Sequence, residues 1–482
     1  MLVPRNIRWF LDRIAFILLI SATSCKSQWL REHPQNAHLD PEFGTCSSDE
    51  LNHSNLVACT QDGCNGDQTT GAISNHVQDL VHVVSSKDGD RLKVEPIEVL
   101  NIIENDFERS FNVNTTLTVL TKPKLPSHSV GGFGATLNMV NLLNCLKRGI
   151  LEQNYRSIIS DLFGSSGAKH STLRLILSRE TISDNGISDL IERLDKVLVD
   201  VGVSSNNVEL LLDLEAMEWS TEVTETLTAI EKKLDSVRAI KSLTLASNSK
   251  ILSTHTPDPK RSNSSDTNLV LSVDTAHRVV SLHDAANFVD SLSTVERKDL
   301  SKIIVQAGNS TPYNILDHLR ASGDFKVVTV AQPRPKTNMA GDWQNAKDYA
   351  VEIMNLLKHG SNHVVEPLSS VDPTGFSWSQ DASLYSLHEY GGAYLRGPMF
   401  YAMSHFSRYL PPDTLPLETS LFTQPNMFAA QYAAYLTPSN DIVTIVLNDN
   451  DYLLPFRMSL DGVIKIYTGI KAKSFNTFVL KR

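Results

Sequence analysis

Runs of alternating apolar and polar residues, or of clustered β-branched residues, predict short strands near both ends of the chain. Near the N-terminus these runs are residues 81–84, 91–94 and 116–120, with a hairpin signal at Asp88-Gly89-Asp90 between the first two. The same pattern returns near the C-terminus at residues 441–447, 453–458, 463–467 and 475–480. A β-rich beginning and a β-rich end predict one sandwich assembled from both ends of the chain.

The middle of the chain follows a different pattern, in which apolar strands alternate with helical stretches. Gly132-Phe133-Gly134 is expected to open a helix that carries Leu137, Val140, Leu143 and Leu146 on one face. Strands are expected at residues 173–177, 242–246, 269–273, 303–306, 326–331 and 363–368, and helices near residues 227–237 and 346–358. Repeated βα units imply a parallel sheet covered by helices, and their number suggests a closed barrel.

The N-terminus has the features of a secretory signal peptide over residues 1–24. Three arginines precede an apolar run at residues 14–20, and small residues follow it. The run is shorter than the roughly 20 residues of a spanning helix, although an anchored N-terminal helix is the alternative interpretation. The mature chain is therefore expected to lie in the secretory pathway, as a lumenal or secreted protein with no transmembrane span.

Cysteines and glycosylation sequons bear on the same compartment. Cys59 and Cys64 enclose a short polar loop, and an oxidising compartment would favour closing it with a disulfide. The pairing of Cys46 and Cys145 stays open. N-x-S/T sequons begin at Asn52, Asn114, Asn263 and Asn309, and so few in 482 residues support a secretory route only weakly.

Composition restricts the class of protein without indicating its chemistry. The chain has 54 acidic and 44 basic residues and a net charge of −10, a balance that argues against a nucleic-acid partner. Five cysteines are too few for a disulfide-dense scaffold. The sequence contains no P-loop, no complete dinucleotide fingerprint and no G-x-S-x-G elbow, and we expect no metal and no cofactor.

One block near the C-terminus resembles a known family. Residues 397–411, GPMFYAMSHFSRYLP, are similar to the QPMFYHLGHFSKFIP stretch of lysosomal glucosylceramidases, in glycoside hydrolase family 30. Shorter likenesses follow the family's order at residues 132–135, 173–175, 243–247, 341–343, 355–357 and 469–482. Cys59 and Cys64 match an N-terminal disulfide loop of that family. The resemblance implies a (β/α)8 barrel with a sandwich built from both ends, and retaining hydrolysis of the β-glucosidic bond of glucosylceramide.

The implied reaction needs two carboxylates about 5–5.5 Å apart, one as acid/base and one as nucleophile. The family places the acid/base Glu in a T-A-E-N-E-P motif at the end of the fourth barrel strand. The stretch at residues 275–280 is expected to match this motif, which puts Val279 at the Glu position. Valine can neither hold nor donate a proton.

The nucleophile of the family lies on the seventh strand, in a motif like F-A-S-E. If residues 325–331 form the sixth strand, no Glu follows before Trp343. The interval from Ala331 to Gly341 is too short for a helix and a further strand. The sequence therefore predicts an α/β fold with a TIM-type barrel that is degenerate or lacks one strand, and it assigns no catalytic residue.

The remaining sugar-binding positions are largely replaced. Arg174 in the second strand and Glu366 in the last strand are the weak candidates for substrate binding. We expect a glucosylceramidase-like pseudoenzyme that is lysosomal or secreted and binds glycolipid, glycan, or an activator or receptor protein. The alternatives are an active retaining β-glucosidase with carboxylates from elsewhere, or a sequence that omits a coding segment near Ala331. The predicted boundaries are the signal peptide at 1–24, the Cys loop and first part of the sandwich at 25–127, the barrel at 128–402 and the rest of the sandwich at 403–482.

Overall fold

The structure is a computed structural model, and it describes the parts of the chain that carry most of its helices and strands. The described residues are 57–60, 63–64, 80–87, 90–95, 97, 102–103, 115–123, 129–138, 149–165, 167–177, 186–203, 208–214, 239–247, 273–279, 282–300, 302–308, 312–332, 342–368, 385–387, 394–423 and 430–482. The predicted signal peptide, Cys46, Cys145 and all four sequons lie outside these residues.

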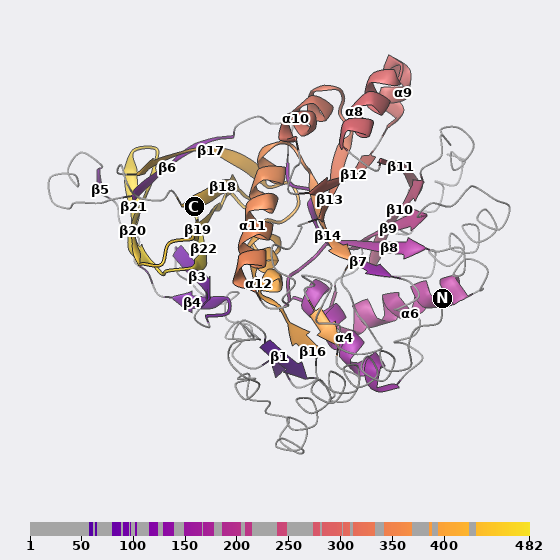
Figure 1. Cartoon of the computed structure of the whole chain (residues 1–482), viewed down its shortest axis with the longest axis horizontal. Helices are drawn as coiled ribbons and strands as arrows, with labels where there is room; N and C mark the ends of the chain where they lie inside the picture. The colour runs from indigo at the N-terminus through magenta and orange to yellow at the C-terminus, as the bar shows by residue number, and fades with distance from the viewer. Residues whose placement is uncertain are drawn as a thin grey trace, which may run out of the picture.

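Eight parallel strands form a closed barrel (Figure 1). In chain order they are β7 (Gly132–Asn138), β8 (Thr172–Leu177), β9 (Val208–Leu214), β10 (Ile240–Ser247), β11 (Val273–Val279), β12 (Lys302–Gly308), β13 (Lys326–Gln332) and β14 (His363–Leu368). Each strand pairs with the next along the chain, and β14 pairs with β7 to close the ring. Closure leaves no exposed sheet edge in the barrel.

This barrel corrects the expectation that a strand is missing. Residues 132–138 form the first strand rather than the start of a helix, and residues 208–214 form a third strand that the sequence pattern did not predict. In β7, Phe133, Ala135 and Leu137 alternate into the core outside the barrel, as a strand requires. The strand expected at residues 269–273 is β11, which begins at Val273. Residues 326–332 are therefore the seventh strand, not the sixth.

Helices surround the barrel. The described helices are α4 (Gly149–Phe163), α6 (Gly186–Asp200), α8 (Leu282–Ser291), α9 (Thr294–Asp299), α10 (Tyr313–Ala321), α11 (Trp343–Lys358) and α12 (Pro398–Ser407). Asp342 caps α11, since its carboxylate accepts a hydrogen bond from the backbone N–H of Gln344 at 2.9 Å. Pro398 begins α12 at a position where its missing N–H costs nothing.

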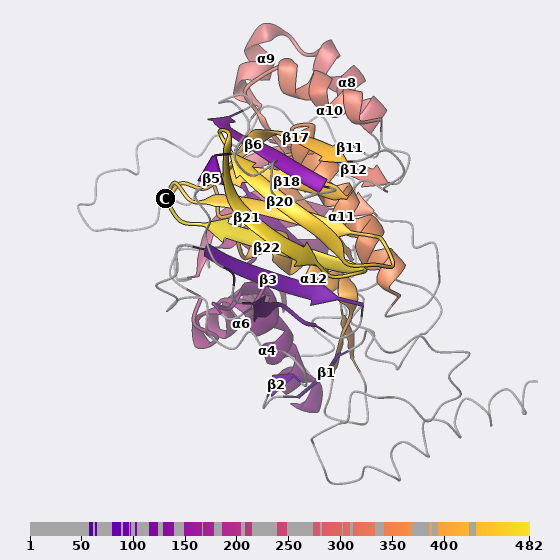
Figure 2. The ribbon, with the colours of Figure 1, turned by 90° about the vertical axis from the view of Figure 1, so that its left-hand side faces the viewer.

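Ten strands from both ends of the chain form the sandwich, in the order β4-β3-β22-β19-β18-β17-β6-β20-β21-β5. The N-terminal strands are β3 (Leu80–Ser86), β4 (Lys93–Glu95), β5 (Ile102–Ile103) and β6 (Thr115–Pro123). The C-terminal strands are β17 (Leu415–Thr423), β18 (Gln431–Leu436), β19 (Ile442–Asn448), β20 (Leu454–Leu460), β21 (Val463–Ile470) and β22 (Ser474–Leu480). The predicted assembly from both ends is confirmed, and Figure 2 shows these strands on one side of the molecule.

The strand β17 joins the two layers of the sandwich. Its first residues pair with β18, and the rest of the strand pairs with β6. Side chains of both layers, among them Leu117, Phe456 and Phe478, pack into one buried cluster between them. All residues of β3 and β19 are buried, because their sheet is covered on both faces.

Two helices fill the space between barrel and sandwich (Figure 1). Every residue of α12 is buried, and α12 packs against α11 and against β22. The ring of Trp343 in α11 lies 4.7 Å from the ring of Phe475 in β22. The apolar core around the barrel continues through these contacts into the sandwich sheet.

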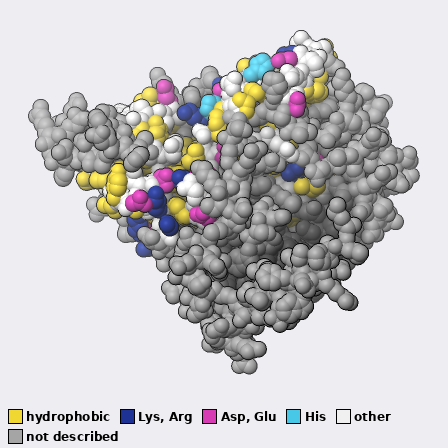
Figure 3. Space-filling model, viewed as in Figure 1, with side chains coloured by type: hydrophobic (Ala, Val, Ile, Leu, Met, Phe, Trp, Pro, Cys, Tyr) yellow, Lys and Arg dark blue, Asp and Glu magenta, His cyan; other side chains and the backbone are white. Residues whose placement is uncertain are grey.

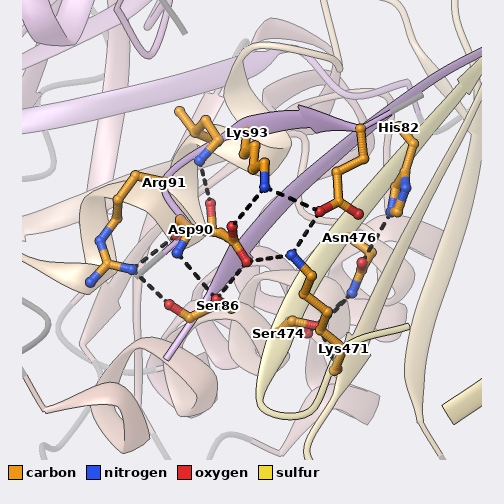
Figure 4. Close-up of polar contacts among 11 residues, drawn as sticks. His82, Ser86, Asp90, Arg91, Lys93, Lys471, Ser474 and Asn476 are labelled. Atoms are coloured by element: carbon orange, nitrogen blue, oxygen red, sulfur yellow. Dashed lines mark hydrogen bonds and ion pairs between the residues drawn. The ribbon is translucent and has the colours of Figure 1, made fainter. Parts of the chain in front are cut away.

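Charged side chains also connect N-terminal and C-terminal strands on the outside of the sandwich (Figures 3 and 4). Lys471 Nζ donates to Asp90 Oδ2 at 2.9 Å and to Glu95 Oε1 at 2.7 Å. Burial would raise the pKa of Asp90, but its hydrogen bonds from Lys471 and Ser86 lower that pKa overall. The cluster is partly exposed, so we expect it to add little to the free energy of unfolding.

A small four-stranded sheet contains β1 (Val57–Thr60), β2 (Gly63–Cys64), β15 (Tyr385–Leu387) and β16 (Tyr394–Arg396). Cys59 lies directly opposite Cys64 in the antiparallel pair of β1 and β2. Opposed Cα atoms in such a pair are about 4.5–5.5 Å apart, within the range of about 4.4–6.8 Å that a disulfide spans.

We predict that Cys59 and Cys64 form a disulfide when the chain folds under oxidising conditions. Non-reducing peptide mapping should recover the two cysteines in one linked peptide that dithiothreitol separates. Replacing Cys59 with Ser should lower the free energy of unfolding by about 2 kcal/mol, the value expected for so short a loop. Recovery of both residues as free thiols from oxidatively folded protein would show the prediction to be wrong.

Candidate functional site

The carboxyl ends of the barrel strands form one rim, and barrels of this type build their active sites at that rim. Apolar side chains fill part of the barrel interior. They form a buried cluster of Leu211, Ile304, Val328, Val330 and Val365. The barrel interior is thus packed, and the polar groups beside this cluster are the ones that define a candidate site.

An ion pair lies inside the barrel between the second and third strands. Asp213 Oδ2 accepts hydrogen bonds from Arg174 Nε at 2.8 Å and from Arg174 Nη2. Arg174 Nη1 lies 3.4 Å from the Thr136 hydroxyl oxygen. Arg174 is 3% exposed and Asp213 is fully buried. A buried charge pair of this kind must be well hydrogen-bonded to offset the cost of removing both ions from water.

Strand register brings these three residues together. Thr136 in β7 pairs with Arg174 in β8, and Asp213 in β9 pairs with Ile176, two residues further along β8. Residues that pair across parallel strands share a face, and so do residues two apart in one strand. All three side chains therefore face the interior, with Asp213 nearer the carboxyl-end rim.

The weak candidate Arg174 is thus inside the barrel, but its guanidinium is bonded to a carboxylate. Asp213 was not among the candidates, since the strand that carries it was not predicted. The sequence does contain an indication of this strand, the apolar run Leu210-Leu211-Leu212 after Val208. A single carboxylate, Asp213, follows this run. A sugar that used Arg174 would have to compete with Asp213 for it.

A second charge pair lies toward the other end of the barrel. Glu209 near the start of β9 accepts from Lys302 Nζ at the start of β12. Both residues precede the centre of their strands, at the amino end, where polar residues of this barrel type serve stability rather than chemistry.

One carboxyl group with a raised pKa lies in the helix layer. Tyr313 OH in α10 donates to Glu352 Oε2 in α11 at 2.6 Å, and burial raises the pKa of Glu352 although this hydrogen bond lowers it. Burial also raises the pKa of Tyr313. A carboxyl with a raised pKa is a candidate general acid. This one lies between two helices outside the barrel, not among the side chains that face its interior.

The observed number of barrel strands changes both expectations about catalytic residues, the position of the acid/base and the absence of the nucleophile strand. Val279 lies in β11, the fifth strand, and pairs with Val305, whose side chain packs in the core outside the barrel. The basis for placing Val279 at the acid/base position, which requires the fourth strand, is therefore wrong. The seventh barrel strand, which was expected to be missing, is present as β13 and ends at Gln332. Residues 333–341 lie outside the described part of the chain.

Glu366 lies in β14, in a stretch where the pairing with β7 is irregular between Val365 and Leu368. Strand alternation does not fix the direction of the Glu366 side chain there, and this side chain is outside the described residues.

Within the described ranges, no three His, Cys, Asp or Glu residues are close enough to hold a metal ion. The helices described for this chain include none that is long and apolar enough to cross a membrane.

We predict that the Arg174–Asp213 pair is worth more as a pair than the two residues are separately. Asp213→Leu should destabilise the fold by about 3–5 kcal/mol, because it leaves a buried arginine without its anion, and Arg174→Met leaves a buried aspartate without its cation. The double variant Arg174→Met/Asp213→Leu should lose much less than the sum of the two single losses. Urea unfolding of all four proteins measures this coupling, and strictly additive losses would contradict it.

Comparison with known proteins gives matches in both parts of the fold. Residues 422–478 match the glycosyl hydrolase family 30 beta sandwich domain. A Caenorhabditis elegans protein named "Putative glucosylceramidase 2" is 28% identical over 196 residues, which are 39% of this chain and 36% of that protein. The matched region therefore spans little more than a third of the length of this curated relative.

Solved structures share the overall fold. SrfJ from Salmonella typhimurium has a TM-score of 0.58 and 11% identity, and an endo-β1,6-glucanase has a TM-score of 0.58 and 12% identity. Each alignment covers 84% of this chain and 100% of the other. A family 30 endoxylanase from Clostridium papyrosolvens C71 has a TM-score of 0.51 at 12% identity, over 76% of this chain and 100% of its own. These structures show the fold, and the sandwich match and the relative show a sequence similarity to glycoside hydrolase family 30.

Proposed function

We propose that this chain is a glucosylceramidase-like protein that binds a β-linked glycolipid or glycan at the barrel rim with little or no hydrolysis. The observation that carries the proposal is that the seventh strand of the complete barrel ends at Gln332 rather than at a carboxylate. The family resemblance puts the nucleophile on this strand. A carboxamide cannot serve as the anionic nucleophile of a retaining glycosidase.

The end of β13 can be compared with the family motif residue by residue. Thr329-Val330-Ala331-Gln332 lies where the resemblance expects F-A-S-E, so Gln332 takes the place of the Glu. Val328 and Val330 belong to the cluster inside the barrel, and alternation puts position 332 on the same face of the strand. No acidic residue follows in the sequence before Asp342.

The fourth strand supports the same conclusion. It is β10, which ends with Ala246-Ser247, and the sequence continues with Asn248-Ser249. Laid on the A-E-N-E part of the family motif, this stretch keeps the Asn and has Ser249 at the acid/base position. Serine has no proton to donate near neutral pH, and loss of general acid–base catalysis alone removes about 10²–10⁴-fold in rate.

The proposed class of ligand rests on sequence similarity to known proteins. The block at residues 397–411 resembles glucosylceramidases, and the Caenorhabditis elegans relative carries that name. A lumenal or secreted location, glycosylation, and an activator or receptor partner belong to the same proposal. The alternative of an active retaining β-glucosidase would need Glu366 and a second carboxylate at the rim. A missing coding segment is no longer needed to explain the strand count, since eight strands are present.

We predict that the purified mature chain does not hydrolyse a fluorogenic β-glucoside at acidic pH above the buffer rate. Ser249→Glu/Gln332→Glu, which restores both carboxylates, should give turnover that neither single variant gives. The matched control is Ser249→Gln/Gln332→Asn, which changes the same positions without adding charge. Turnover by the unaltered chain that Glu366→Gln abolishes would refute the proposal.

The binding half of the proposal needs its own measurement. Saturation-transfer NMR with octyl β-glucoside, below its micelle concentration, should show contact between the sugar protons and the protein. Octyl β-galactoside serves as the control for contact through the alkyl chain alone. Equal transfer to the sugar protons of both glycosides, or no transfer to either, would leave the proposed sugar site without support.

A further inference from the structure

A buried histidine connects the helix between the two domains to the sandwich. His405 in α12 is fully buried. Its Nδ1 lies 2.8 Å from the Thr477 hydroxyl oxygen in β22, and its Nε2 lies 2.9 Å from the Ser85 hydroxyl oxygen in β3. Both ring nitrogens are thus used, each by a strand from a different end of the chain.

The Ser85 hydroxyl is shared with the hairpin that follows β3. Its oxygen accepts the backbone N–H of Leu92 at 2.9 Å, and Leu92 is itself fully buried. The Ser85 hydroxyl can therefore either donate its own proton to His405 or accept a second hydrogen bond, from the His405 ring. One side chain of α12 thereby depends on the hydrogen bonds of the N-terminal hairpin.

A second buried histidine lies on the opposite face of the same sheet. His82 in β3 has its Nε2 3.1 Å from Asn476 Oδ1 in β22, as Figure 4 shows, and its ring stacks on Phe478 at 4.3 Å. Asn476 Nδ2 in turn donates to the Ser474 hydroxyl at 2.8 Å. The pair β3–β22 therefore carries one histidine on its sandwich-core face and contacts another on the face toward α12.

The charged groups around His405 oppose a positive charge on its ring, whereas those around His82 act in both directions. His405 is influenced by His82 and by Arg408, the residue that follows α12, and both oppose its protonation. His82 is influenced by Glu95 of β4, which favours protonation, and by Lys471 before β22, which opposes it. In the described hydrogen bonds, the partners of both rings are hydroxyl or amide oxygens and never a carboxylate.

Burial dominates the resulting equilibrium. It lowers the pKa of His405 to about 3 and lowers the pKa of His82 as well. A base whose pKa falls on folding binds fewer protons folded than unfolded, so stability rises with pH across the interval between the two values. The contribution is complete above pH 6.5 and is lost as pH falls from there toward 3.

We propose that the contact between barrel and sandwich at α12, β3 and β22, called the joint below, is acid-labile. The joint is stable while His405 and His82 are neutral and weakens when they are protonated. Protonation places a cation between α12 and the sheet, where water is excluded. Release of α12 would also loosen α11, whose ring of Trp343 packs on Phe475 beside His405. The joint is tighter near neutral pH than in an acidic lumen.

The test is the pH dependence of unfolding in the full mature chain. Between pH 7 and pH 5, His405 alone should raise the unfolding equilibrium constant about 25-fold, for a folded pKa near 3 and an unfolded one near 6.5. Urea unfolding followed by tryptophan fluorescence reports this change. His405→Gln, which keeps a hydrogen-bonding side chain but does not titrate, should remove about that factor from the pH dependence.

His318→Gln is the matched control, because His318 is about half exposed and pairs with Asp290 on the surface. It should keep most of the pH dependence of the unaltered chain. Glu352 works in the opposite direction, since its raised pKa favours folding as pH falls, and its effect cancels in the comparison of variants. If His405→Gln and the unaltered chain show the same pH dependence, the proposal is overturned.

A second measurement does not depend on the variant folding. Hydrogen–deuterium exchange at the imidazole C2 position, followed by mass spectrometry across pH, reports the protonation of each histidine in the native chain. His405 should exchange slowly and show no transition down to pH 5. A transition of His405 near pH 6.5 in the folded protein would overturn the proposal.

Discussion

Hydrogen bonding between β14 and β7 joins the last barrel strand to the first and closes the barrel. The number that each strand takes in the ring follows from that closure. A closed barrel of this kind has eight strands, so each strand has a fixed number from one to eight. The fourth and seventh numbers are the ones to which the family resemblance assigns chemistry. Counting from the closed ring makes them β10 and β13.

Inside the ring, the free energy of charge burial constrains what the chain can do. The Arg174 guanidinium is held by Asp213, and both side chains are buried beside the apolar cluster. A ligand that reaches the rim meets a neutral pair rather than a free cation. This fits the proposal that the chain keeps the barrel fold while the fourth and seventh strands, to which the resemblance assigns carboxylates, end in Ser247 and Gln332.

The sequence pattern predicted the sandwich from both ends, because its strands are short runs with clear turns between them. It failed at β7, where Leu137 and the leucines beyond it follow a helical period although Phe133, Ala135 and Leu137 alternate as a strand. It also missed β9, because an apolar run buried on both faces has no alternation to detect. Missing one strand shifted the numbering and produced the wrong assignments of Val279 and of an absent nucleophile strand. Asp213 was lost with β9, and its partner Arg174 could be found only through the resemblance.

The contacts between domains were beyond sequence reasoning for a different reason. His405 meets Thr477 and Ser85, which are 72 and 320 residues away in the chain, and no local pattern indicates such contacts. The block that carries the family resemblance contains His405 and forms α12. This block therefore lies buried between barrel and sandwich.

Trapping of a covalent intermediate tests the central claim most directly, because a retaining glycosidase must form one on its nucleophile. The mature chain would be incubated with an activated 2-deoxy-2-fluoro-β-glucoside, and its intact mass would be recorded beside that of the Ser249→Glu/Gln332→Glu variant. We expect no added mass on the unaltered chain, and a fluoroglucosyl adduct at position 332 in the variant. A stoichiometric adduct on a carboxylate of the unaltered chain would show that the protein keeps a working nucleophile and would contradict the account.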